Sequence, residues 1–209
     1  MHRYGIVPRK LDSRTIAVTS VFMAMVIALE VFPIVGLTDI RIPGVQFTLD
    51  WTGIPLVLIF FFFGTFLSLV GIGVMWAAIG YRNPIGALFK VPAELFKILA
   101  LALGMILLRN TNVTFRTRIA VYAVLASLFC GIGMYFVNLQ LLPILWGYEY
   151  DAAAAIALIL VPWNIIQSLV NVLGGAIIYT MVPGDMKLQI DSIHEPVLQE
   201  LADEFEDSF

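Results

Sequence analysis

Charged residues are scarce in this sequence, and cysteine is almost absent. Of the 209 residues, 13% are charged and 60% are hydrophobic, whereas soluble domains carry about 25% charged and about 45–50% apolar residues. The single cysteine, Cys130, cannot form an internal disulfide. It lies inside an apolar run, which favours a buried small residue over a reactive thiol. The shortage of charge argues against an ordinary soluble domain.

The signatures of common enzymes are missing as well. The sequence contains no glycine-rich phosphate loop, no His-Glu-x-x-His pair and no Gly-x-Ser-x-Gly turn. Its histidines, His2 and His194, lie in the terminal segments, far from every apolar run. We therefore expect no enzyme activity, no catalytic residue, no metal site and no nucleic-acid partner. Uphill transport by this chain would need energy from another subunit or from an ion gradient.

The apolar residues form runs that are long enough to cross a bilayer, which takes about 20 residues per helix. They predict an all-α membrane protein, a bundle of six transmembrane helices. The run 51–80 is too long for one upright helix, and Gly64-Thr65 is a plausible turn between two short spans; one long tilted helix is the alternative. Apolar and polar residues alternate in the loop 34–49, a pattern that would permit a short hairpin. The expected spans cover residues 15–32, two within 51–80, 84–108, 119–142 and 155–182.

The distribution of basic residues predicts how the bundle is oriented. With six spans, eight Lys and Arg residues fall on one side and two on the other, and the basic side is cytoplasmic by the positive-inside rule. Both termini are then cytoplasmic. The larger group is Arg3, Arg9, Lys10, Arg14, Arg109, Arg116, Arg118 and Lys187, and the smaller is Arg41 and Arg82.

Three segments follow from this layout. Residues 1–13 form a cytoplasmic N-terminal segment without the features of a signal peptide, and residues 14–182 form the membrane domain. Residues 183–209 form a cytoplasmic tail, acidic and without Lys or Arg after position 190, which either stays solvated or forms a short amphipathic helix.

Ionisable residues within a span are costly and are therefore candidates for function. The span 84–108 holds Lys90, Glu94 and Lys97, at spacings that place them on one helix face where they can pair. The alternative is an ion cluster that only locks helix packing, although buried ion pairs are a costly source of stability.

A second polar stripe lies on the last span, where Asn164, Gln167 and Asn171 share one face. Such amides either line a site or join helices by hydrogen bonds. Both spans enter the membrane from the outer side, so that Asn164 and Gln167 lie at about the same depth in the membrane as Lys90 and Glu94. We expect these four residues to bind substrate in one pocket that is open to the exterior.

Aromatic residues lie near the outer ends of the spans, where most belong to the usual interfacial belt. Trp51 is expected near the mouth of the pocket, and Trp163, beside Asn164, is the best candidate to stack on a planar ligand.

The first span carries a stripe of small residues, Ser20, Ala24 and Ala28, at intervals of four. Small residues at this spacing let another helix approach closely. The stripe is either internal packing or a docking surface for a separate membrane protein.

Three segments together resemble a known family, the substrate-binding S components of energy-coupling factor (ECF) vitamin transporters, with riboflavin-binding members most similar. LDWTGIPLVLIFFFFGTF is similar to that family's Asp-x-x-x-x-Pro opening of the second span, and VPWNIIQSLVN resembles a Pro-x-Asn entry to the sixth span. The third segment is AMVIALEVFPI, which ends the small-residue stripe. The segments cover residues 49–66, 161–171 and 24–34.

The resemblance implies a vitamin-binding subunit of an ATP-driven importer in a prokaryotic plasma membrane. It also implies docking onto a transmembrane T component that carries two cytoplasmic ATPases. No cofactor is implied beyond the bound vitamin, for which riboflavin or a related flavin is the best match. The sequence departs from the riboflavin pattern in having Gln167 where a lysine is common and Gly64-Thr65 where Gly-Pro is common. The competing hypothesis is a stand-alone secondary transporter or channel that uses Lys90, Glu94 and Lys97.

Overall fold

The computed structural model describes residues 13–34, 36–45 and 47–182, and within them the chain folds into six helices and one small sheet. The predicted N-terminal segment and the acidic tail fall almost entirely outside the described residues, so both stay predictions. The elements are α1 (Ser13–Val31), β1 (Asp39–Arg41), β2 (Thr48–Asp50), α2 (Gly53–Phe63), α3 (Thr65–Arg82), α4 (Pro84–Leu107), α5 (Phe115–Trp146) and α6 (Tyr150–Met181).

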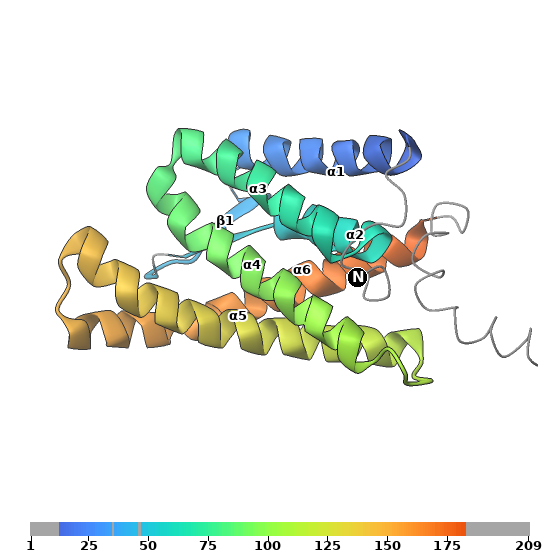
Figure 1. Ribbon diagram of the computed structural model, residues 1–209. Helices are drawn as coiled ribbons and strands as arrows, with labels where there is room; N and C mark the ends of the chain where they lie inside the picture. Colours follow the sequence, from blue (N-terminus) through green and yellow to red (C-terminus); the bar gives the residue numbers. More distant parts are fainter. Residues whose placement is uncertain (1–12, 35, 46, 183–209) are drawn as a thin grey trace, which may run out of the picture.

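The helices run lengthwise as a bundle around α2 (Figure 1). Helix α2 is buried along almost its whole length and contacts α1, α3 and α6, while α4, α5 and α6 pack side by side in sequence order. Helix α1 lies at the edge of the bundle and packs mainly on α2 and α3. The hairpin and the α3–α4 and α5–α6 turns gather at one end of the bundle, and the start of α1 and the end of α6 lie at the other (Figure 1).

The apolar stretch 51–80 is divided into two helices, as the sequence analysis favoured. Gly64 separates α2 from α3 with φ 82° and ψ −170°, a conformation that is open essentially to glycine alone. The four phenylalanines before it are buried and pack against one another and against aromatic rings such as Tyr122 and Tyr179. The break therefore lets 11 residues of α2 enter the core and α3 return along its surface.

Four helices, α1, α3, α5 and α6, are long and apolar enough to cross a membrane. Helix α2 has 11 residues and would reach only about 16 Å, and α4 carries three charged residues at its centre. The chain is thus mostly helical, with the character of a multi-pass membrane protein. The expected six spans and the cytoplasmic termini stay predictions.

The loop expected before the last span is much shorter than the sequence suggested. Helix α5 continues through Pro143 to Trp146, and α6 begins at Tyr150, so that only three residues connect them. The expected end of this span at residue 142 was therefore too early. A proline inside a helix removes one hydrogen bond, and α5 packs extensively on α6. The helix ends at Gly147, in the left-handed region with φ 69°, whose N–H bonds to the carbonyl of Pro143.

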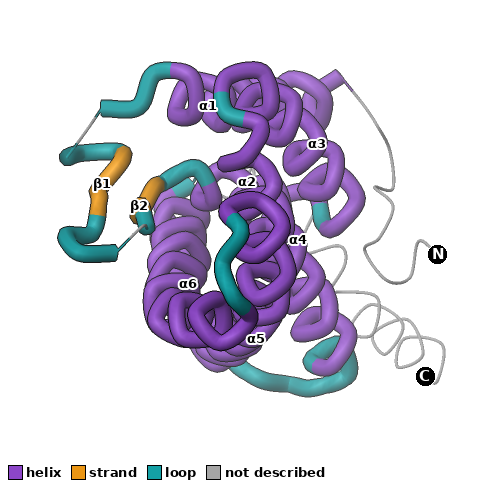
Figure 2. Tube along the Cα trace, turned by 90° about the vertical axis from the view of Figure 1, so that its left-hand side faces the viewer, coloured by secondary structure: helices purple, strands orange, loops and turns teal. Residues whose placement is uncertain are grey.

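The predicted hairpin is present between α1 and α2. Strands β1 and β2 pair antiparallel, with Asp39 opposite Asp50 and Arg41 opposite Thr48. Viewed along the bundle, this hairpin stands beside α2 and α6 (Figure 2). Residues of the hairpin therefore lie next to the polar faces of α4 and α6.

Candidate functional site

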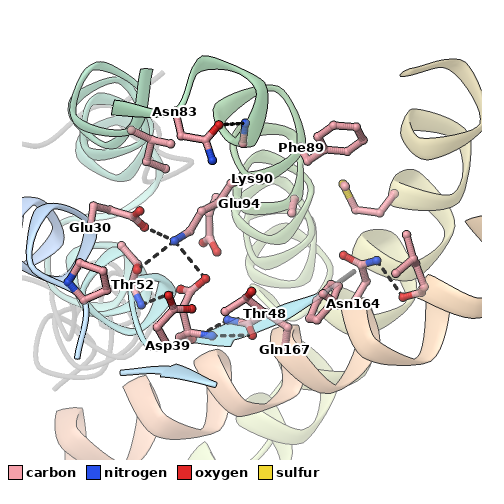
Figure 3. A pocket seen from close by; sticks show the side chains of 18 of the residues that line it. Glu30, Asp39, Thr48, Thr52, Asn83, Phe89, Lys90, Glu94, Asn164 and Gln167 are labelled. Carbon is pink, nitrogen blue, oxygen red and sulfur yellow. Dashed lines mark hydrogen bonds and ion pairs between the residues drawn. The ribbon is translucent and has the colours of Figure 1, made fainter. Parts of the chain in front are cut away.

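A cavity of about 410 Å³ opens at the hairpin end of the bundle. Residues from α1, the hairpin, α3, α4, α5 and α6 line it (Figure 3). Apolar atoms make up most of its exposed surface. Small-molecule sites in proteins usually have volumes of about 300–1,000 Å³ and a few convergent polar groups. The cavity is thus of a size to hold one small organic molecule.

The structure brings together the four polar residues that the sequence placed in one pocket. Lys90 and Glu94 reach the cavity from α4, and Asn164 and Gln167 reach it from α6 (Figure 3). Contact between these side chains and a ligand remains a prediction. Their shared location follows from the two helix faces and the common depth inferred from the spans.

The two predicted tryptophans do not line this cavity. The indole N–H of Trp51 donates to the carbonyl of Leu37, 2.5 Å away, and so ties the start of α2 to the hairpin. Trp163 is half-buried on α6. The tryptophan in the wall is Trp146, which stacks on Phe89 with ring centroids 5.5 Å apart. Sequence reasoning assigned Trp146 only to the interfacial belt.

Lys90 pairs across the bundle rather than along its own helix. Its ammonium contacts Glu30 of α1, and lies 3.0 Å from Asp50 Oδ2 and 3.1 Å from the Thr52 hydroxyl. The expectation that Lys90 pairs within α4 was therefore wrong, because spacing along one helix does not show acids supplied by other segments. The sequence did contain a signal for this pairing, because Glu30 is the one acidic residue of α1 and a charged residue within a span needs a partner.

Asp50 joins this ion cluster to α6. Burial raises the pKa of its carboxyl. The charge of the Lys90 ammonium and the hydrogen bonds from Lys90 and Thr52 lower the pKa by more, so that it lies below the ordinary value. The carboxylate is therefore ionised at neutral pH. The backbone N–H of Asp50 donates to Gln167 Oε1 at 3.1 Å, and Gln167 Nε2 donates to the Asp50 carbonyl at 2.5 Å. The amide of Gln167 is thus occupied by the hairpin.

A second ion pair lies deeper. Lys97 Nζ is 2.6 Å from Glu94 Oε1, and both side chains are buried. The other carboxylate oxygen, Glu94 Oε2, is buried without a hydrogen-bond partner among the described residues. Asn171, expected on the same polar stripe as Gln167, does not line the cavity; it is fully buried close to Gly53. Glu94 is therefore the member of this pair that faces the cavity.

Two asparagines complete the polar wall. Asn164 is buried, and its Nδ2 donates to the Leu160 carbonyl at 2.9 Å. Asn138 of α5 is also buried and lines the cavity, and its amide has no hydrogen-bond partner within the described part of the chain. The sequence analysis missed Asn138, although an amide inside an apolar span was a visible signal.

The small-residue stripe of α1 points away from the bundle. Ser20, Ala24 and Ala28 are exposed, whereas the buried residues of the helix lie on its opposite face. The stripe is therefore not used for packing within this chain. The buried residues are Thr15, Thr19, Val26 and Glu30.

Comparisons with known proteins support the fold. A scan against protein-family models finds no match, and a search of the curated proteins finds none either. Among solved structures, the chain is similar to the S component for biotin from an ECF-type ABC transporter, with a TM-score of 0.56 and 14% identity. The match covers 84% of this chain and 95% of that one. The chain thus has the fold of an ECF S component, and at this identity the likeness concerns the fold alone.

Proposed function

We propose that this chain is the substrate-binding membrane subunit of an ECF-type importer and captures a small vitamin-like molecule from outside the cell. The observation that carries the proposal is the cavity of about 410 Å³, into which α4 and α6 project buried polar groups. Its place in a fold shared with an S component supports a binding role. An unsatisfied buried carboxylate oxygen is costly, and a ligand would supply its missing partner.

The sequence segments quoted above favour riboflavin or a related flavin as the ligand. The biotin of the structural neighbour is not carried over, because the two chains are 14% identical. Gln167, in a position where riboflavin-binding members commonly have lysine, is engaged with the backbone of Asp50. The ligand would then form hydrogen bonds with the remaining polar groups, Glu94, Asn164 and Asn138.

As a binding subunit, the chain would work with a transmembrane T component and two cytoplasmic ATPases in a prokaryotic plasma membrane. The exposed stripe Ser20, Ala24 and Ala28 supports docking, since no helix of this chain's described part covers it. Energy for uptake would then come from the ATPases.

The decisive experiment is to purify the tagged chain from its native membrane in mild detergent. We expect native mass spectrometry to show one small molecule bound per chain, and the two ATPases to co-purify. A chain that elutes without ligand or ATPases, and that alone drives uptake into proteoliposomes along a proton gradient, would instead be the secondary transporter.

A further inference from the structure

The buried polar atoms that α4 and α6 contribute to the cavity, and that remain available, are acceptors. Glu94 Oε1 is taken by Lys97, whereas Oε2 is buried and has no partner in the described chain. In Asn164, the atom that meets the Leu160 carbonyl must be the nitrogen, because a carbonyl only accepts. Within the described residues, its Oδ1 is therefore left as a free acceptor. In Figure 3, Glu94 and Asn164 face the same space from α4 and α6.

The two ammonium groups close to the interior, in contrast, are already paired with carboxylates. Lys90 contacts Glu30, Asp50 and Thr52, and Lys97 is committed to Glu94. Arg82 lies at the exposed end of α3, where its Nη1 donates to the Val31 carbonyl at 3.2 Å. Among the described residues, an anionic group in the interior would therefore meet no unpaired cation. The Arg82 guanidinium keeps further N–H donors and would meet an anion only at the exposed edge of the cavity.

The charge of the lining points the same way. Four carboxylates line the cavity, those of Glu30, Asp39, Asp50 and Glu94, against the two cations Arg82 and Lys90. Even with Lys97 included, negative charge is in excess. Because charges interact strongly where water is excluded, the interior favours a neutral or positive ligand over a negative one.

We propose, building on the function proposed above, that the cavity selects an uncharged or cationic nitrogen heterocycle. Its N–H groups would donate to Glu94 Oε2 and Asn164 Oδ1, with the Asn138 amide as a further contact. Carboxylate or phosphate groups would be kept out of the interior. Sites that hydrogen-bond a specific ligand N–H discriminate strongly against an analogue that lacks it, because the buried acceptor is then left unpaired.

Three vitamins of different charge test the ligand class on the purified full chain: riboflavin (neutral, ring N–H), thiamine (cationic, ring amino group) and biotin (anionic). Titration calorimetry should show that riboflavin or thiamine binds and that biotin is at least about tenfold weaker. Methylation of the donor nitrogen of the bound vitamin should weaken binding by about tenfold or more. Glu94→Gln should cause a similar loss, and methylation should cause little further loss in that variant.

The matched control is Glu149→Gln, since Glu149 is exposed in the α5–α6 turn and does not line the cavity. Tightest binding of biotin, or methylated ligand bound as well as the parent, would overturn the assignment and leave vitamin capture intact. The methylation test needs no variant, so a poorly folded Glu94→Gln protein does not remove it. If none of the three vitamins binds, the molecule that co-purifies with the chain is identified instead. An anionic molecule, or one without N–H donors, would overturn the inference. A chain without any bound molecule contradicts the proposed function itself.

Discussion

Gln167 of α6 holds both backbone groups of Asp50, with the N–H and the carbonyl of Asp50 bonded to the two ends of one side-chain amide. The same aspartate carries the carboxylate that lies 3.0 Å from Lys90 of α4. One residue of the hairpin is thus fixed to two helices at once. The double attachment fixes the end of β2 beside the cavity.

Removing the amide should loosen the hairpin. In Gln167→Leu both Asp50 backbone groups lose their partners, which should cost about 1–3 kcal/mol locally. Hydrogen–deuterium exchange should then show the Asp50 amide exchanging roughly tenfold faster or more, while the centre of α5 is unchanged. Gln140→Leu is the control, because Gln140 faces outward on α5. Equal exchange in both variants would show that other contacts hold the hairpin.

Gly53 begins α2 at a point where no side chain fits. A Cβ at this position would lie 2.1 Å from Asn171 Nδ2 and 2.7 Å from Lys97 Nζ. Both neighbours are fully buried, so they have little room to move. The glycine therefore allows α2 to approach the buried Lys97 and Asn171 closely, behind the Glu94 carboxylate.

Gly53→Ala should consequently destabilise the protein by about 1–3 kcal/mol through overpacking. Gly73→Ala is the matched control, since nothing lies within 4 Å of a Cβ at Gly73 and alanine is the better helix former. Thermal unfolding in detergent should show a lower midpoint for the first variant and an unchanged or higher one for the second. Similar midpoints would mean that Asn171 and Lys97 rearrange at little cost.

The sequence predicted those features that depend on neighbours along the chain. The hydrophobic runs predicted the six helices of the described chain, and Gly64 was correctly expected to separate two of them. The helical periodicity of the segments that form α4 and α6 correctly placed Glu94 and Asn164 beside one cavity. Helix ends were less accurate: the fifth span was expected to end at residue 142, whereas α5 continues through Pro143 to Trp146.

What the sequence did not predict depends on packing between segments. The partners of Lys90, which are Glu30, Asp50 and Thr52, lie on segments far from α4 in sequence. The same holds for the Gln167 amide, whose hydrogen bonds to the backbone of Asp50 were not predicted. A helical pattern shows which residues of one helix share a face. Which residues of other segments pack against that face depends on the fold.

The docking proposal predicts a selective loss of assembly. Ala24→Trp or Ala28→Trp adds volume to a stripe on which a T component helix would have to lie closely. Co-purification of the ATPases should be abolished, whereas ligand binding by the variant chain should persist because the stripe lies opposite the buried face of α1. Met25→Trp is the control, an exposed residue outside the stripe. Normal assembly of both alanine variants would remove the stripe from the proposal.

The orientation in the membrane gives the final prediction. The α4–α5 linker and the α5–α6 turn lie at opposite ends of the bundle (Figure 1). The positive-inside rule places the linker in the cytoplasm, because Arg109 lies in it and Arg116 and Arg118 follow it in the first turn of α5. Single cysteines at Asn110 and Tyr148, both exposed, would report the two ends in a Cys130→Ser background. On intact cells an impermeant thiol reagent should modify position 148 and not position 110, and both should react after permeabilisation. The reverse pattern would place the cavity on the cytoplasmic side, and capture of a molecule from outside would then be impossible in this arrangement.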